Sequence, residues 1–552
     1  MAEQNTRINM PRRLRFSADP WSVGAIVIAF LVLLPIVSVV VIALNPVQNV
    51  WPHLISTTLP RYLGNTVILM VSVAALAAAM GTGAAWLVVM YRFPLSRVLE
   101  WLLLLPLAIP AYVGAYALVD FLEYAGPVQV ALRELFGWAD AQAYWFPEIR
   151  SRPAAVLVLA VALFPYVYLL SRAAFREQSG GVYEVAQALG AGPLGRFLRV
   201  GLPLARPAIA AGSAIVMMET VNDFGVVDYF AVQTLTTGIF SVWLQGGNVG
   251  GAAQIAMVIL VLILSLVALE KLSRRRMRFF NPSRHSRPIA PTRLTGGARW
   301  LAMLACAIPF LLGFVLPVGV IASHALQASD GWLVPGLVQA LGNTLLVGGL
   351  AALGTVAAAL FLVYGVRLSH HALPRLLLPV TTLGYAAPGA VLAVGLLIPM
   401  ASMDNALADI VERLTGADIG LVMTGSAFAV IYAYSVRFFA IAQGAADSAM
   451  GRITPSLPMA ARSLGRTARG TLTSVYLPLI RGSVGTALLL VFVDCVKELP
   501  ATLLLRPFGF NTLSTRVYEK ASLENLGDAS PAALLVIGVG MVAVLLLARA
   551  NR

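Results

Sequence analysis

Four carboxylates lie inside long apolar stretches of this chain and could contact a cation. Glu219 and Asp223 are four residues apart, so on a helix they share one face, and Asp494 and Glu498 repeat that spacing in the second half of the chain. Ionisable side chains within apolar spans are costly and usually face a bundle interior or a water-filled cavity. We therefore expect all four to line a pathway. In the alternative interpretation, Lys497 neutralises Glu498 or Asp494, and Asp223 caps a helix end.

Two further residues could extend this set toward the outer surface: Asp228 and Tyr229. Carboxylate and phenolate oxygens suit hard cations. A pathway must also release what passes through it, so a tight metal cage is not expected and no metal ligands are assigned. Cys306 and Cys495 both lie inside apolar segments, so neither a disulfide framework nor a metal cluster can be drawn from them.

The composition indicates an integral membrane protein. Of 552 residues, 59% are hydrophobic and 12% are charged, the latter roughly half the share found in soluble proteins. The net charge of +14 comes mostly from arginines between apolar stretches, which we interpret as topology signals and not as a nucleic-acid surface. An arginine cluster at 274–278 is expected to touch anionic membrane lipid.

Twelve stretches are poor in charge and long enough to cross a bilayer, and they are expected to be helices because an open strand leaves backbone groups unpaired in hydrocarbon. The sequence thus predicts an all-α integral membrane protein with about twelve spans. They cover residues 21–44, 65–91, 99–120, 154–170, 207–222, 251–269, 300–322, 343–366, 376–400, 420–434, 482–496 and 531–547.

The distribution of basic residues predicts the orientation. With the amino terminus inside, most of the 39 Lys and Arg residues fall in cytoplasmic segments, whereas the outer segments 223–250 and 323–341 contain none. By the positive-inside rule, this multi-pass chain has both termini in the cytoplasm.

The chain is an internal repeat. Motifs of the first half recur 275 or 278 residues later, as when the sequence LGNT at 63–66 returns at 341–344. The offset spans an even number of helices, so the halves form a parallel repeat with six spans each. We assign residues 1–272 to the first half, 273–298 to a cytoplasmic linker rich in Arg and Pro, and 299–552 to the second half.

Two basic loops, at 184–209 and 459–484, repeat with the same internal spacing and both face the cytoplasm in this topology. Each combines a short helix, a glycine that permits a sharp turn and a Leu-Pro pair that precedes the next span. A cytosolic partner could grip such a helix as a rigid handle. The alternative is an interfacial amphipathic helix without a partner, which the repetition disfavours.

The loop spacing resembles the cytoplasmic "EAA" loop in permease subunits of binding-protein-dependent ABC importers. There are two departures: Val185 replaces an alanine, and Met459 stands where the second copy should have its glutamate. Matching residues are Glu184, Ala186, Gly190, Val200, Leu202 and Pro203 in the first copy and Ala460, Ala461, Gly465, Val475, Leu477 and Pro478 in the second.

This resemblance implies the type I ABC importer permease fold, with each loop forming a coupling helix that sits in a groove of an ATPase subunit. It implies two copies of a cytosolic ABC ATPase, a periplasmic substrate-binding protein and a location in the bacterial inner membrane. ATP and Mg belong to the partner ATPase, and no cofactor is expected in this chain. None of Lys271, Lys497 and Lys520 follows a glycine, so the chain lacks a phosphate-binding loop and is not itself the enzyme.

A second stretch, 218–256, resembles the corresponding region of fused permeases for ferric iron. Fused permeases for thiamine share this architecture, and those for sulfate or polyamines share the loop, so these cargoes remain alternatives. A secondary transporter driven by an ion gradient is an alternative of a different class, in which the four acids would couple transport to the gradient; it leaves the duplicated loop unexplained.

Overall fold

The computed structural model describes residues 20–275, 289–327, 332, 334–369, 372–382, 384 and 387–550. This part of the chain is almost entirely helical, as expected, with one pair of two-residue strands. The first half comprises α1 (Pro20–Leu44), α2 (Trp51–Ser56), α3 (Leu59–Met90), α4 (Ser96–Leu102), α5 (Ala111–Leu122), α6 (Pro127–Phe136), α7 (Arg152–Glu177), α8 (Gly180–Ala188), α9 (Pro193–Arg196), α10 (Leu202–Asn222), α11 (Gly225–Tyr229), α12 (Leu235–Phe240) and α13 (Val249–Arg275).

The second half repeats this order. Its helices are α14 (Gly297–Phe310), α15 (Leu316–Gln327), α16 (Leu337–Leu368), α17 (Ala372–Leu377), α19 (Gly389–Thr415), α20 (Phe428–Arg437), α21 (Phe439–Gly451), α22 (Ser456–Ser463), α23 (Ala468–Thr471), α24 (Leu477–Lys497), α25 (Pro500–Leu505), α26 (Leu513–Ser522) and α27 (Leu526–Ala550). The correspondence is closest around the loops, where α9 and α10 match α23 and α24 residue for residue at an offset of 275.

Ten helices of the described chain are long and apolar enough to cross a membrane, and two bent helix pairs raise the number to twelve. The twelve expected spans are all represented, but some expected boundaries are wrong. The span expected at 99–120 is broken, because the segments Ser96–Ala108 and Ala111–Phe136 meet at 97°. Pro110, which has no N–H to donate, is the residue just before α5.

The ninth and tenth expected spans are also displaced. A span was expected at 376–400, but α19 begins at Gly389 and continues to Thr415, beyond the apolar stretch. The next span was expected at 420–434, whereas the bent pair α20 and α21 covers Phe428 to Gly451. The expected spans do not include residues 404–413, which belong to α19.

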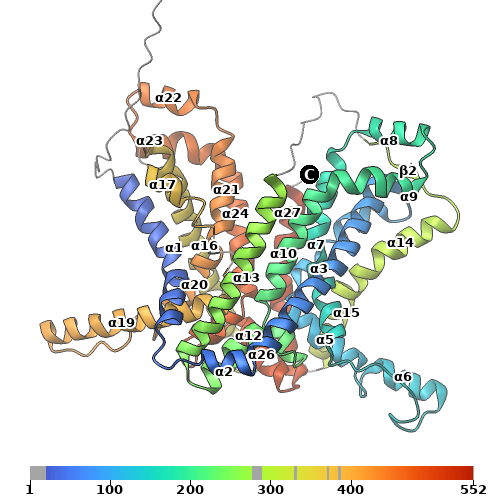
Figure 1. Ribbon diagram of the computed structural model, residues 1–552, viewed down its shortest axis with the longest axis horizontal. Helices are drawn as coiled ribbons and strands as arrows, with labels where there is room; N and C mark the ends of the chain where they lie inside the picture. The colour runs from blue at the N-terminus through green and yellow to red at the C-terminus, as the bar shows by residue number, and fades with distance from the viewer. Residues whose placement is uncertain are drawn as a thin grey trace, which may run out of the picture.

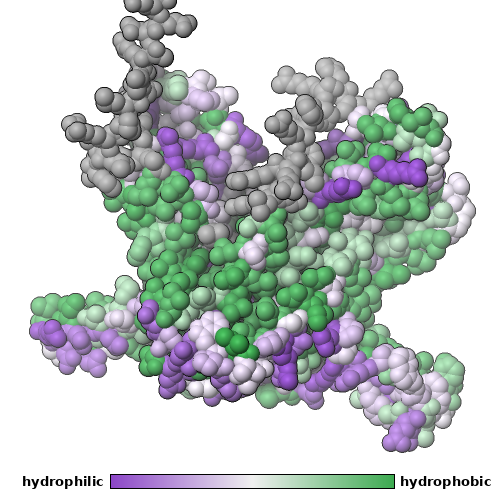
Figure 2. All heavy atoms as spheres, in the orientation of Figure 1, coloured by the Kyte–Doolittle hydropathy of each residue, from purple (hydrophilic) through white to green (hydrophobic). Residues whose placement is uncertain are grey.

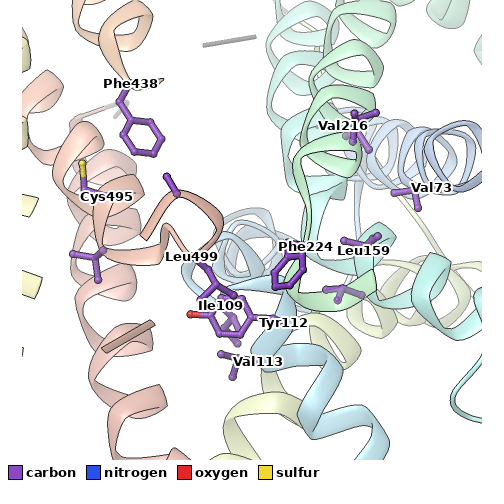
Figure 3. Packing of buried hydrophobic residues seen from close by; sticks show 14 of the residues in the cluster. Val73, Ile109, Tyr112, Val113, Leu159, Val216, Phe224, Phe438, Cys495 and Leu499 are labelled. Carbon is purple, nitrogen blue, oxygen red and sulfur yellow. The ribbon is translucent and has the colours of Figure 1, made fainter. Parts of the chain in front are cut away.

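The first helix of each half packs against the other half. Helix α1 packs along α16 and α19 of the second half, and α15, which continues the first span of the second half, packs against α5 of the first half as well as α27 of its own half. At one such contact, the ring of Trp21 stacks on Phe361 with centroids 4.9 Å apart and meets Tyr364 edge-on at 5.2 Å. The two halves therefore share one apolar core, part of which is drawn in Figure 3.

The repeated LGNT motifs have a structural role. The Asn65 side chain donates to the Gln233 carbonyl at 2.8 Å, and Asn343 donates to the Asn511 carbonyl at 2.9 Å. In both halves the following threonine accepts a bond from the first backbone N–H of the short helix α12 or α26. Two repeated motifs thus fix the same loop onto the same long helix in each half.

The linker is described only in part. Residues 276–288 of the expected 273–298 segment lie outside the described residues. Its end forms β2 (Thr292–Arg293), which pairs in parallel with β1 (Tyr91–Arg92) just after α3. This end of the linker is therefore held against the first half beside α8, since Ile289 and Thr292 line a small hollow with Glu184 and Tyr183.

Candidate functional site

All four expected pathway carboxylates line one cavity. This cavity, of ≈ 160 Å³, lies between the halves and is bounded by α5, α7 and α10 on one side and by α20 and α24 on the other. Glu219, Asp223, Asp494 and Glu498 all contribute to its wall. At its edge, Leu499 of the second half and Tyr112 of the first half both lie beside Gly225. Figure 3 labels Leu499 and Tyr112.

The members of each pair differ in local structure. Glu219 and Asp494 lie within α10 and α24, but Asp223 and Glu498 follow the last residues of those helices. The Asp223 carboxylate accepts bonds from the N–H groups of Val226 at 3.0 Å and Val227 at 3.2 Å. The expectation that each pair shares one helical face is thus wrong, because the helix ends first. Asp223 caps α11, as the alternative interpretation predicted, and it lines the cavity as well.

Glu498 caps the start of α25 and also has an ionic partner. Its carboxylate accepts bonds from the N–H groups of Ala501 at 3.0 Å and Thr502 at 3.1 Å, and from the Thr502 hydroxyl. Arg437 donates to the same carboxylate at 2.8 Å; the side chain of Glu498 is 0% exposed and that of Arg437 is 12% exposed.

Arg437 is the base that pairs with Glu498. The alternative interpretation of the sequence named Lys497 as the partner of Glu498 or Asp494. Lys497 donates instead to the backbone carbonyl of Leu107, across the cavity in the first half. Sequence reasoning missed Arg437 because it placed the tenth span at 420–434 and left this residue outside it. The available signal was a single arginine inside a longer apolar stretch, 428–442.

The bases of the cavity belong to one half only. At an offset of 275 residues, Arg437 corresponds to Ala162 and Lys497 corresponds to Asn222, and all four line the cavity. The acids are therefore duplicated between the halves, but the bases are not.

Asp228 and Tyr229 do not line the cavity. Asp228 accepts a bond from the Tyr518 hydroxyl at 2.7 Å, and the Arg150 guanidinium lies 5.1 Å from the centre of the Tyr229 ring. Desolvation raises the pKa of Asp228, and the bond from Tyr518 partly offsets this. Both residues are on α11, at the contact between the halves. The expectation that they continue the carboxylate set is not supported by their positions.

The described residues include no group of three or more His, Cys, Asp or Glu side chains arranged to hold a metal ion. The four acids are thus spread around the cavity wall and do not converge on one point. Such an arrangement can attract a cation but does not form a complete ligand shell.

Both repeated loops have the same geometry. The short helices α8 and α22 carry Glu184, Ala186 and their counterparts Met459 and Ala461, with Ala460 beside them. Each helix ends at a left-handed glycine, Gly190 at φ 82° and Gly465 at φ 84°.

Each helix end has the hydrogen bonds of a Schellman motif. The N–H of Ala191 donates to the Ala186 carbonyl at 2.9 Å, and that of Arg466 donates to the Ala461 carbonyl at 3.0 Å. The repeated glycine is thus a helix-ending residue, because residues with a Cβ rarely adopt this conformation.

The expected Leu-Pro pairs start the next long helices. Leu202 and Pro203 are the first residues of α10, and Leu477 and Pro478 are the first residues of α24. Figure 1 shows α8 and α22 at one end of the molecule, opposite α12 and α26.

The loop helices carry exposed apolar side chains. Leu189 is 83% exposed and Leu464, at the equivalent position, is 84% exposed. Glu184 is exposed on α8, whereas its counterpart Met459 is 67% exposed on α22. The two surfaces are therefore alike in shape and differ in charge.

The sequence is similar to those of known transport proteins. A family model described as "Binding-protein-dependent transport system inner membrane component" matches residues 74–279, which include the cavity acids of the first half and its loop. The matched region is thus an inner-membrane component of a binding-protein-dependent transport system. The chain is also similar over nearly its whole length to the Fe(3+)-transport system permease protein FbpB 2 of Haemophilus influenzae, at 26% identity over 88% of this chain and 89% of the relative.

Other relatives match about a third of this chain. The molybdenum transport system permease protein ModB of Escherichia coli is 28% identical over 34% of this chain and 82% of its own length. A probable sulfate transport system permease protein, cysT, of Helicosporidium sp. subsp. Simulium jonesii is 27% identical over 33% of this chain and 66% of its own length. The relatives thus agree on the kind of permease and differ in the cargo that their names state.

Proposed function

We propose that this ABC importer permease moves ferric iron. A periplasmic binding protein delivers the iron to the outer end, and two copies of a cytosolic ATPase dock on the loops at 184–209 and 459–484. The coupling loops and both termini then lie in the cytoplasm. The chain itself carries out no bond chemistry; ATP and Mg act on the ATPase.

The observation that carries this proposal is the cavity between the halves, with four carboxylates and two bases in its wall. One of the bases, Arg437, is already paired with Glu498. The remaining excess of negative charge attracts a cation and opposes the passage of an oxyanion such as molybdate or sulfate. The relative that aligns with nearly the whole chain is named for Fe(3+), which agrees with this charge balance.

The coupling loops transmit the motion of the ATPase to the membrane-spanning helices. Each presents an exposed apolar residue and a helix end fixed by a left-handed glycine, so a motion of the ATPase reaches α10 or α24 through a short, ordered segment. ATP binding can shift the two halves only as far as the ATPase binds one arrangement better than the other. A gradient-driven carrier has no need of this paired surface.

The test is transport by the full chain, reconstituted in liposomes with its ATPase and binding protein. We expect ATP-dependent uptake of ferric iron and none of molybdate or sulfate. The double variant Glu219→Gln with Asp494→Asn should reduce iron uptake while the complex stays assembled. Glu134→Gln with Glu148→Gln is the matched control, since both acids are exposed and outside the cavity.

Three results would contradict the proposal. Uptake of molybdate or sulfate in place of iron would reject ferric iron as the cargo. Full iron uptake by the Glu219 and Asp494 double variant would remove these two acids from the pathway. Uptake without ATP or ATPase would reject the ATP-driven mechanism and favour the gradient-driven class.

A further inference from the structure

Two amphipathic helical arms project from the end of the molecule opposite the coupling loops. The first arm is α6 with the loop that follows it, residues 127–145, and the second arm is the far part of α19, residues 401–415. They are equivalent in the repeat, because α6 shifted by 278 residues falls on 405–414. In Figure 1 they extend to opposite sides of the body.

The second arm has one apolar stripe. Met403, Leu407, Ile410 and Leu414 recur at helical spacing, so they lie on a single side, and they are between 37% and 79% exposed. On the opposite side are the exposed acids Asp409 and Glu412. A helix with an exposed apolar stripe and a charged opposite face is typical of a membrane surface.

The base of this arm is fixed to the body. Asp404 is 1% exposed and accepts bonds from the N–H groups of Met423 and Thr424, each at 2.7 Å, in the segment that returns from the arm. The carboxylate thus ties the two ends of the projection together. The arm continues α19 without a break, so that helix sets its direction.

The first arm has an aromatic cluster in place of the stripe. Phe136 stacks on Trp138 with ring centroids 4.8 Å apart, and Trp138 stacks on Tyr144 at 4.6 Å. Trp145, next in the chain, is 85% exposed. Exposed Trp and Tyr residues gather at the level of lipid headgroups, where their rings suit both apolar and polar surroundings.

The direction of the apolar side identifies what covers it. In Figure 2 the hydrophobic surface of the spans continues onto the side of the second arm that faces the coupling-loop end, and the side facing away is hydrophilic. A bilayer around the spans thus meets the apolar side of the arm. The exposed charges of this arm are Asp409, Glu412 and Arg413, which give it no excess of positive charge for anionic headgroups.

We propose that both arms lie on the outer surface of the bilayer, with their apolar and aromatic side chains inserted among the lipids and their charged sides toward the periplasm. This placement rests on the proposed orientation, in which the coupling loops face the cytoplasm. The arms hold the outer end of each half at a fixed depth in the membrane. Insertion depends on apolar area and not on lipid charge.

The test measures the surroundings of single cysteines in the full chain, reconstituted in phosphatidylcholine vesicles after spin labelling, with Cys306 and Cys495 replaced by Ala. Labels at Leu407→Cys and Ile410→Cys report the stripe, and labels at Asp409→Cys and Glu412→Cys report the opposite side. Val37→Cys, exposed on the spanning helix α1, is the lipid reference, and Asp418→Cys is the water reference.

We expect collisions with oxygen to dominate at the stripe, as at Val37, and collisions with a water-soluble nickel chelate to dominate at the other two positions, as at Asp418. The pattern should be the same when phosphatidylglycerol is added. A first-arm label at Trp145→Cys should also resemble the lipid reference. Because neither ATPase nor cargo is present, the outcome is independent of the test of function.

Three results would overturn the proposal. Nickel-dominated collisions at all four positions would place the arm in water. Shielding of the stripe from both reagents would mean that protein covers it, such as a second copy of this chain. Oxygen-dominated collisions only after phosphatidylglycerol is added would mean that headgroup charge, and not apolar insertion, holds the arm.

Discussion

Replacing the glycines that end the coupling helices tests the mechanical link directly. Gly190 and Gly465 have φ near +83°, and a Cβ at either position would meet no atom within 4 Å. The substitutions Gly190→Ala and Gly465→Ala therefore change the backbone preference and little else. Holding an L-residue in the left-handed region costs about 1–2 kcal/mol, which corresponds to about 5- to 30-fold in affinity if the ATPase binds only the Schellman-capped form.

The assay is titration of purified ATPase onto the permease in lipid nanodiscs. Each alanine variant should raise the Kd by about 5- to 30-fold, from the same conformational cost. Gly181→Ala is the matched control, since it lies on the same helix α8 without a left-handed backbone and its Cβ would meet only the Ser179 hydroxyl at 3.7 Å. If all three variants bind the ATPase as the parent does, the capped geometry is not what the ATPase recognises.

Three further predictions follow from single contacts. Glu184→Gln should weaken the salt dependence of ATPase binding, because exposed ionic contacts are screened. The isolated second loop, which has Met459 in place of the acid, should depend on salt less than the isolated first loop, and equal dependence of the two isolated loops would contradict this. Arg437→Met leaves Glu498 buried without its cation and should cost about 3–5 kcal/mol in detergent unfolding, most of it recovered by adding Glu498→Gln; equal loss in single and double variants would reject the pairing. Asn343→Ala removes one loop bond and should cost about 1 kcal/mol in the same measurement without changing ATPase affinity, and a changed affinity would show that this bond is not purely structural.

Composition and repetition were enough to predict the fold class because they are properties of the whole chain. The bilayer requires long apolar helices whatever the packing, and a duplicated sequence requires duplicated structure. The equivalence of α9 and α10 with α23 and α24 follows from the spacing of the loop motif alone.

The errors lie where helices break or continue against the apolar pattern. The hydropathy of residues 99–120 indicates one span, and only the turn at Pro110 divides it. Residues 401–415 contain charges that resemble a loop, yet they alternate with apolar residues at helical spacing and continue α19. Both features depend on local geometry, which average hydrophobicity does not capture.

The cavity acids were predicted from their positions in apolar stretches of both halves, but their partners were not. Capping of α11 by Asp223 depends on the turn after Asn222, and the pairing of Arg437 with Glu498 depends on the approach of α20 to α25. The sequence indicates which residues are costly to bury. It does not indicate which distant donor offsets that cost.

The departures from symmetry affect the two halves unequally. In the second half, Arg437 pairs with Glu498, Lys497 lies three residues from Asp494, and the coupling helix carries Met459 in place of an acid. In the first half, Ala162 and Asn222 stand where those bases would be, and Glu184 remains. Duplication provided two equal halves, and these substitutions place both bases of the cavity, and its ion pair between Arg437 and Glu498, in the second half.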